Sequence, residues 1–152
     1  MKKSILLLLF FCYSSVIFSQ EAGVSYDEKL AKSLNADERG MKKYVFCLLK
    51  TGSNTTATKE ESEKFFKGHM DNIGRLAKEG KLVLAGPFMK NERNYRGIYI
   101  FNASSIEEAK EFVATDPAVQ SNLLEAELTL WYGTAALQEI LKIHEKIAKP
   151  KM

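Results

Sequence analysis

The stretch MKKYVFCLLK, residues 41–50, decides the fold because it is apolar on both sides of an extended chain. Side chains along a strand alternate between two faces, so both faces of this strand need a cover. One face carries Val45, Cys47 and Leu49, and the other carries Tyr44, Phe46 and Leu48. The stretch YRGIYIFN, residues 95–102, has the same pattern. We therefore expect these two segments to be the central strands of one sheet.

The neighbouring segments alternate between helix and strand signals. Helices are expected over residues 58–79 and 105–116, and further strands over residues 81–88 and 125–132. The first helix begins with a capping box, Thr58 to Glu61, and ends before Gly80. Pro87 places the second strand at an edge of the sheet, where a missing N–H is tolerated. The order predicts an α+β fold, a ferredoxin-like βαββαβ sandwich followed by an extra C-terminal helix.

Two helices can cover only one face of such a sheet, yet both central strands are apolar on both faces. A strand with one face in water alternates apolar and polar residues instead. An open apolar face of this size would be a liability in water. The simplest cover is an identical sheet, so the sequence predicts a homodimer whose sheets pack face to face.

The last strand indicates what that second face contains. Ala126, Leu128 and Leu130 are expected to point toward the helices, and Glu127, Thr129 and Trp131 away from them. A Trp ring beside a carboxylate and a hydroxyl suits the wall of a substrate-binding pocket. It suits an anchor of the dimer interface equally well, so both interpretations of Trp131 stay open.

The two ends of the chain lie outside the βαββαβ pattern. Residues 1–20 have the layout of a signal peptide, with Lys2 and Lys3 before an apolar run of about 14 residues. A spanning helix needs roughly 20 apolar residues, so an uncleaved anchor is the less favoured interpretation. We expect a periplasmic or secreted protein that is free of the membrane after cleavage. Residues 21–40 form an N-terminal arm, and residues 135–152 form an amphipathic helix.

Composition argues against several classes of partner and site. The 152 residues include 22 Lys and Arg against 19 Asp and Glu, a net charge of +3 that falls to +1 without Lys2 and Lys3. This near-balance argues against nucleic acid as a partner. No HExxH, paired CxxC, P-loop or GxGxxG is present, so we expect neither a metal site nor a cofactor. Cys47, in a buried strand, is expected to be an inert thiol rather than a nucleophile.

One histidine lies where an apolar residue is expected. Spacings of 3, 4 and 3 residues put Phe66, His69, Ile73 and Leu76 on the helix face that meets the sheet. An imidazole buried there without a partner costs about 1–3 kcal/mol. Asp116 is the best candidate partner, because it follows the second helix on the same side of the sheet. The pair is either an acid/base pair for proton transfer or a satisfied core histidine beside a turn residue.

Two stretches of the chain resemble the YCII-related domain family. One is GHMDNIGRLAKEGKLVLAGPF, residues 68–88, and the other is ATDP, residues 114–117, with the LLEAELTLWYGTAAL that follows. The arm YDEKLAKSLNADERGMKKYVF also resembles secreted members of the family. The resemblance covers about residues 41–137, and we assign residues 41–134 to the domain.

This resemblance implies a fold and a site. The fold is a dimeric α/β barrel of two ferredoxin-like sheets. The site is a small-molecule site around a His–Asp pair, carried here by His69 and Asp116, with Gly86 and Pro87 in the loop beside it. Some relatives are similar to dehydrochlorinases or muconolactone-isomerase-type enzymes, whereas others look like accessory domains, so the resemblance supplies no reaction.

Two classes of function stay open. In the first, His69 is a catalytic acid/base oriented by Asp116, and Trp131 with Tyr99 or Phe101 forms an apolar wall. The reaction would be elimination or isomerisation of a small cyclic or carbonyl compound. In the second, the same pocket binds a ligand without turnover, or the protein is a dimeric structural module of the cell envelope. A His69 that opens onto a cavity favours the first class, and a sealed His69 favours the second.

Overall fold

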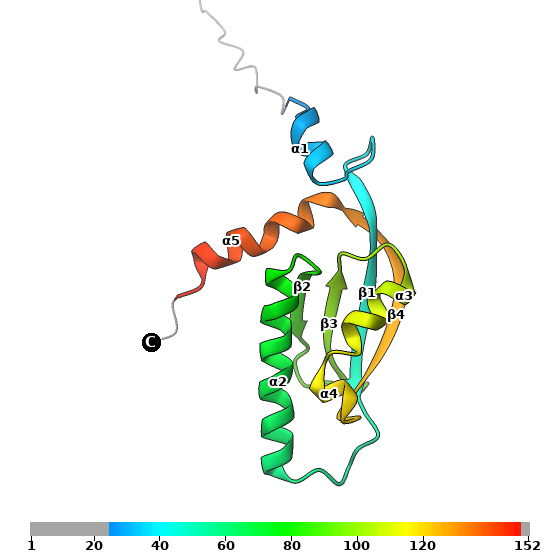
Figure 1. The fold of residues 1–152 in the computed structure, drawn as a ribbon, viewed down its shortest axis with the longest axis vertical. Helices are drawn as coiled ribbons and strands as arrows, with labels where there is room; N and C mark the ends of the chain where they lie inside the picture. The colour runs from blue at the N-terminus through cyan, green and yellow to red at the C-terminus, as the bar shows by residue number, and fades with distance from the viewer. Residues whose placement is uncertain (1–24, 150–152) are drawn as a thin grey trace, which may run out of the picture.

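The computed structural model describes residues 25–149, and its centre is an antiparallel four-stranded sheet in the order β2-β3-β1-β4 (Figure 1). The strands are β1 (Met41–Thr51), β2 (Leu82–Pro87), β3 (Tyr95–Phe101) and β4 (Leu124–Thr134). The two segments with apolar residues on both faces are the central strands, as predicted. Pro87 lies in the edge strand β2, also as predicted. The ferredoxin-like βαββαβ order is confirmed.

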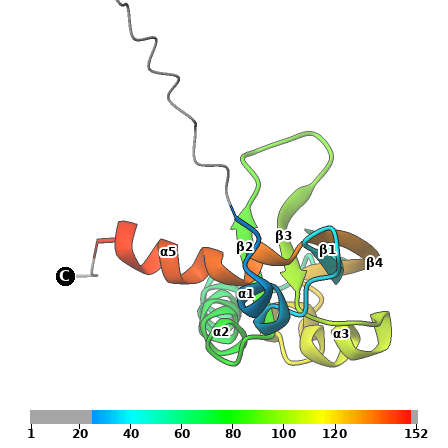
Figure 2. The same ribbon diagram turned by 90° about the horizontal axis from the view of Figure 1, so that it is seen from above.

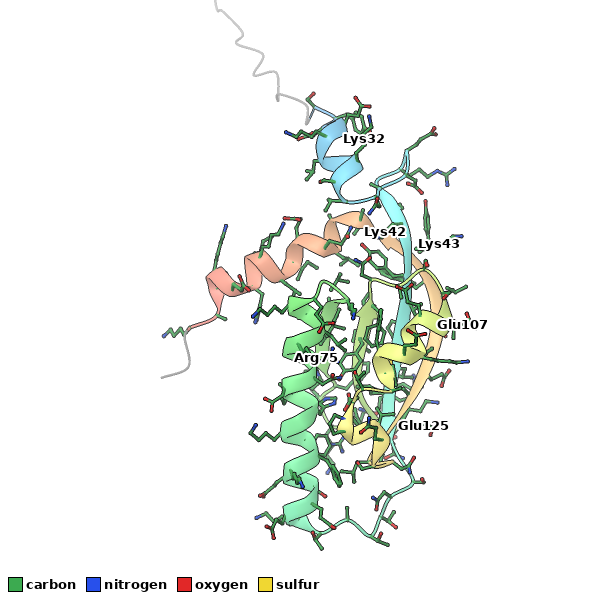
Figure 3. All side chains as sticks on the ribbon, in the orientation of Figure 1. Lys32, Lys42, Lys43, Arg75, Glu107 and Glu125 are labelled. Atoms are coloured by element: carbon green, nitrogen blue, oxygen red, sulfur yellow. The ribbon has the colours of Figure 1, made fainter. Side chains whose placement is uncertain are left out.

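Three helices cover one face of the sheet, α2 (Lys59–Lys78), α3 (Ile106–Val113) and α4 (Pro117–Gln120) (Figure 2). The capping box predicted for α2 is present, because Thr58 Oγ1 accepts from Glu61 N–H while the Glu61 carboxylate accepts from Thr58 N–H. Gly80, with φ of +71°, follows the end of α2 in the left-handed conformation that glycine adopts easily. Side chains fill the space between α2 and the sheet (Figure 3).

The larger core cluster lies between these helices and the sheet. It contains Val45, Cys47, Leu49, Leu76, Leu82, Tyr99, Phe101, Ala103, Ala109, Phe112, Val113, Ala118 and Leu124. Ala126 and Leu128 pack against it, as the alternation along β4 predicts. Leu130 shares their face by register but remains 55 % exposed, so the helices do not reach the end of β4.

A second, smaller cluster lies on the opposite face of the sheet. Its buried members are Tyr44, Val83 and Ile100, with Phe46, Leu84 and Leu137 packed against them. Leu137 belongs to η1 (Ala135–Glu139), a 3-10 turn that covers one end of this face before α5 (Ile140–Ile147). The segment predicted as one helix is therefore two short elements, and α5 extends past β2 (Figure 2). Phe46, Leu48 and Ile98, farther along this face, are only half-buried.

The N-terminal arm contains a short helix, α1 (Glu28–Ser33) (Figure 1). It lies at the end of the sheet where β1 begins and β4 leads into η1. The Gln138 Nε2–H donates to the Leu34 carbonyl at 2.7 Å, and the Tyr132 hydroxyl donates to the Asp37 carboxylate. These bonds tie the arm to the end of β4 and to η1. The predicted signal peptide, residues 1–20, lies outside the described residues.

A glycine sets how closely α4 approaches α2. A Cβ built on Gly68 would lie 2.9 Å from Cγ of Pro117, so the two helices touch at a point without a side chain. Pro117 follows Asp116, and Gly68 precedes His69. The Gly68–Pro117 contact therefore brings the two predicted partners within reach of each other.

We predict that Gly68→Ala destabilises the domain by about 1 kcal/mol, because overpacking outweighs the gain in helix propensity. The matched control is Gly74→Ala on the same helix, where an added Cβ meets nothing within 4 Å. That variant should stabilise the domain by about 0.5–1 kcal/mol. Chemical denaturation of both variants measures the two signs. Equal stabilisation by both substitutions would contradict the close contact.

Candidate functional site

The helix α2 places His69 on the face that meets the sheet, as the apolar spacing predicts. His69 is 9 % exposed, whereas its neighbours in sequence, Gly68 and Met70, lie nearer the surface. The ring packs edge-on against Phe66, one turn earlier on α2, with ring centroids 5.9 Å apart. An imidazole enclosed in this way needs hydrogen-bond partners from the protein.

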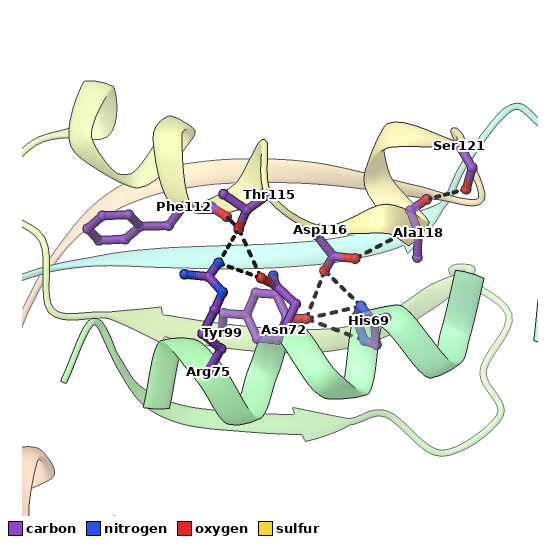
Figure 4. Close-up of polar contacts among 9 residues, drawn as sticks. All are labelled: His69, Asn72, Arg75, Tyr99, Phe112, Thr115, Asp116, Ala118 and Ser121. Atoms are coloured by element: carbon purple, nitrogen blue, oxygen red, sulfur yellow. Dashed lines mark hydrogen bonds and ion pairs between the residues drawn. The ribbon is translucent and has the colours of Figure 1, made fainter. Parts of the chain in front are cut away.

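Asp116 supplies the main partner. Asp116 is fully buried at the N-cap of α4, where its Oδ1 accepts from Ala118 N–H at 3.0 Å. Its Oδ2 lies 2.7 Å from Nδ1 of His69 (Figure 4). An ionised carboxylate only accepts, so Nδ1 of His69 carries the proton, and Nε2 holds the lone pair when the ring is neutral. The predicted contact between His69 and Asp116 is present.

Tyr99, on β3, completes the cluster from the sheet. Its hydroxyl donates to Oδ2 of Asp116 at 3.1 Å, and its oxygen lies 3.3 Å from Nε2 of His69 (Figure 4). Burial raises the pKa of the Tyr99 hydroxyl, and the charge of Asp116 raises that pKa further. Tyr99 therefore stays protonated and remains a donor. The sequence predicts Tyr99 only as a residue of the pocket wall and does not predict its bond to Asp116.

A second polar network, next to this cluster, joins α2 to the segment that carries Asp116. The Arg75 guanidinium donates to Asn72 Oδ1 at 2.7 Å and to Thr115 Oγ1 at 2.8 Å (Figure 4). Thr115 in turn donates to the Phe112 carbonyl at 2.7 Å. These bonds hold the residue just before Asp116 against α2. The sequence does not predict this role of Arg75, because the residue lies off the apolar stripe of its helix.

A cavity of about 340 Å³ opens beside His69. It is lined by Leu49, Phe66, His69, Met70, Ile73, Ala85, Gly86, Pro87, Arg96, Gly97, Ile98, Tyr99 and Leu124. Gly86 and Pro87, predicted as binding residues, therefore share this wall with His69 and Tyr99. The cavity is mostly apolar and within the size range of small-molecule pockets. A larger groove of about 740 Å³, between α3 and β4, has neither His69 nor Asp116 on its walls.

The structure does not bring Trp131 to this cavity. Trp131 pairs with Tyr44 across β1 and β4, and their ring centroids are 5.9 Å apart. Both side chains lie on the face opposite the helices, whereas Tyr99 and His69 lie on the helix side. The predicted wall of Trp131 with Tyr99 is therefore wrong. Strand alternation predicts the correct face for Trp131. It does not predict that His69 and Tyr99 lie on the other face.

Cys47 lies directly across β1 and β3 from Tyr99 and is fully buried. Burial raises the pKa of the Cys47 thiol to about 12, with a further contribution from the nearby charge of Asp116. A thiol with this pKa is almost entirely protonated at neutral pH and is a poor nucleophile. These values favour the inert-thiol interpretation. Within residues 25–149, no group of three His, Cys, Asp or Glu side chains is arranged to hold a metal ion.

The contact of His69 with Asp116 makes a prediction about the ring tautomer. In Asp116→Asn, the amide oxygen stays with the Ala118 N–H, and the amide NH₂ faces His69 as a donor. We expect the proton to move from Nδ1 to Nε2, because Nδ1 must then accept. Long-range ¹H–¹⁵N spectra of the imidazole measure the tautomer. The control Asp71→Asn, at a surface ion pair with Lys67, should leave the His69 signals unchanged. An unchanged tautomer in Asp116→Asn would count against the contact.

The chain is similar to a curated protein by sequence and to a solved structure. The chain is 32 % identical over 77 residues to the uncharacterized protein YjpA of Bacillus subtilis (strain 168), covering 51 % of this chain and 87 % of YjpA. A solved structure is similar at 17 % identity and a TM-score of 0.44, over 57 % of this chain and 92 % of that chain. It is 5-chloro-2-hydroxyhydroquinone dehydrochlorinase (TftG) from Burkholderia phenoliruptrix AC1100, in complex with 2,5-dihydroxybenzoquinone.

The model of the YCII-related domain matches residues 44–131, which is more than half of the chain. The match begins at the fourth residue of β1 and ends within β4. It therefore spans all four strands and the helices that carry His69 and Asp116. The chain belongs to the YCII-related domain family.

Proposed function

We propose that the cavity beside His69 binds a small cyclic or carbonyl compound and that His69 exchanges a proton with it. The observation that carries this proposal is the position of His69 between a buried carboxylate and an apolar cavity. Asp116 holds Nδ1 at 2.7 Å on one side, and the cavity of about 340 Å³ lies against the residue on the other. A base of this kind is oriented by its carboxylate and used through its second nitrogen.

The cluster supports acid/base chemistry in both directions. When Nε2 takes a proton from a bound molecule, the imidazolium is stabilised by the carboxylate of Asp116. Return of that proton to a different atom of the molecule is isomerisation, and departure of a leaving group after proton removal is elimination. Both reactions need only a positioned base and acid, so the proposal involves no cofactor. Asp116 orients His69 and does not touch the bound molecule in this mechanism.

A second candidate function is binding without turnover. It is favoured by the Tyr99 oxygen, which lies 3.3 Å from Nε2, and by a His69 side chain that is only 11 % exposed. If the Tyr99 hydroxyl donated to Nε2 rather than to Asp116, both ring nitrogens would be occupied by protein groups. The protein would then be a ligand-binding or structural module of the cell envelope.

Export and dimerisation belong to the proposal as well. The composition of residues 1–20 supports export through a cleaved signal peptide. Within residues 25–149, no helix has the length and apolar character that crossing a bilayer requires. The half-exposed Phe46, Leu48 and Ile98 on the face opposite α2 support a homodimer whose sheets face each other.

Deuterium incorporation tests whether His69 exchanges protons with a ligand. The purified protein is incubated in D₂O with a small-molecule extract of its source cells, and mass spectrometry follows gains of one mass unit. We predict that at least one compound exchanges a C–H proton, and that His69→Gln slows this exchange about a hundredfold or more. The matched control is His144→Gln, at the exposed second histidine on α5, which should leave the rate unchanged.

Two results of this experiment would contradict catalysis. The first is that no compound gains deuterium with the unaltered protein. The second is that His69→Gln exchanges as fast as the unaltered protein does. If, in the first case, a compound co-purifies with the unaltered protein but not with His69→Ala, the binding function replaces the catalytic one.

Multi-angle light scattering after size-exclusion chromatography tests the homodimer. We predict a mass of two chains for the unaltered protein and of one chain for Leu48→Lys, because a charge on the second sheet face opposes burial. The control is Leu130→Lys, which changes an exposed residue of the helix-side face. Far-UV circular dichroism verifies that both variants fold. A single-chain mass for the unaltered protein would contradict the dimer.

A further inference from the structure

Strand β4 is an edge strand with β1 as its only neighbour among the described residues. The two strands pair in one unbroken register, from Met41 opposite Thr134 to Thr51 opposite Leu124. In an antiparallel ladder, alternate residues of an edge strand direct their backbone N–H and C=O groups toward the partner, and the other residues direct theirs outward. The outward groups are free to pair with a further strand.

Two hydrogen bonds at the ends of this ladder identify the outward residues of β4. Gly52 N–H donates to the Leu123 carbonyl, and Ala135 N–H donates to the Gly40 carbonyl, both at 2.9 Å. Both bonds continue the register of the ladder, so the odd-numbered residues of β4 bond to β1. The even-numbered residues therefore direct their N–H and C=O groups to the free edge. Those at the middle of the strand are Ala126, Leu128, Leu130 and Tyr132.

The groove of about 740 Å³ between α3 and β4 lies beside this edge. Alternation puts the side chains of the same even-numbered residues on the helix side, where Ala126 and Leu128 pack against the larger core cluster. Figure 1 shows α3 next to β4 on this side. The groove also has apolar residues of the helices on its walls, namely Ile106, Val113 and Val119. A chain paired with β4 would direct every second side chain toward this groove.

We propose that the free edge of β4 binds an extended peptide as a fifth strand, and that apolar and basic residues alternate along this peptide. Backbone hydrogen bonds to an edge strand supply affinity in this mode of recognition, and the alternate side chains supply specificity. The aliphatic groove favours apolar side chains on the helix side of the added strand. The site shares no part of the chemistry proposed for His69.

The charge of β4 favours basic residues at the other positions of the peptide. The side chains of Glu125 and Glu127 point away from the helices and are exposed, and Glu127 forms an ion pair with Lys50 of β1. Side chains of the added strand that point to the same face would lie next to these two carboxylates. Opposite charges on neighbouring strands stabilise their pairing, and like charges oppose it.

Amide hydrogen exchange, followed by NMR, tests this inference on the full mature chain, residues 21–152. The probes are acetyl-Lys-Val-Lys-Val-Lys-Val-Lys-amide and the matched peptide with Glu in place of every Lys. We expect the Lys peptide to slow exchange at Ala126 and Leu128, whose N–H groups point outward, and to leave Glu127, already bonded to β1, unchanged. We also expect the Glu peptide to bind about tenfold more weakly or less.

Two pairs of variants separate the backbone from the charge. Ala126→Pro removes one outward N–H and keeps the bonds to β1, so it should weaken binding of the Lys peptide about tenfold, whereas Ala126→Ser should not. Glu125→Lys should reduce the preference for the Lys peptide, whereas Glu63→Lys, on the exposed side of α2, should not. Circular dichroism verifies folding, and the Glu125 pair suffices if Ala126→Pro does not fold.

Three results would overturn the proposal. The first is that neither peptide slows exchange at the outward amides. The second is equal binding of the two peptides, which would contradict the alternation of apolar and basic residues. The third is protection of the outward amides in the protein without peptide, because a second copy or another part of the chain would then occupy the edge. Light scattering distinguishes these two occupants.

Discussion

The hydrogen bond between His69 and Asp116 is the constraint on which the site depends. It places an imidazole on a helix face that otherwise consists of Phe66, Ile73 and Leu76, and the buried carboxylate makes that placement tolerable. Three separate parts of the chain must meet for this bond to form, because α2 carries the ring, α4 the carboxylate and β3 the hydroxyl of Tyr99. The fold therefore supplies the orientation of His69 that acid/base chemistry requires.

Close packing between α2 and α4 explains how a small domain holds Asp116 beside His69. Gly68 lets Pro117 approach α2, and the network of Arg75, Asn72 and Thr115 fixes the residue before Asp116 from the other side. Neither feature touches the cavity. Both hold the segment between α3 and α4 against α2, so they fix the position of Asp116 beside His69. The cavity wall, by contrast, includes the edge strand β2, which leads into a hairpin whose residues 87–94 are exposed.

Much of this arrangement follows from periodicity in the sequence, and the rest depends on contacts that periodicity does not describe. Strand alternation identified β1 and β3 as central, and helical spacing identified His69 as a buried polar residue. The interpretation of Trp131 as a wall of the His69 site is wrong, because alternation predicts two faces but not which of them contains the site. The β1–β3 register shift between Leu49 and Lys50 depends on how two strands pair, so the sequence of either strand alone does not predict it. The Arg75 network likewise requires the position of α4.

A double-mutant cycle of His69→Leu and Asp116→Ala measures the central interaction most directly. The free energy of unfolding is determined for the unaltered protein, the two single variants and the double variant under one set of conditions. The account predicts a coupling free energy of about 1–3 kcal/mol, because either substitution alone leaves the other buried group without its partner. A coupling near zero, with additive losses from the two substitutions, would contradict it.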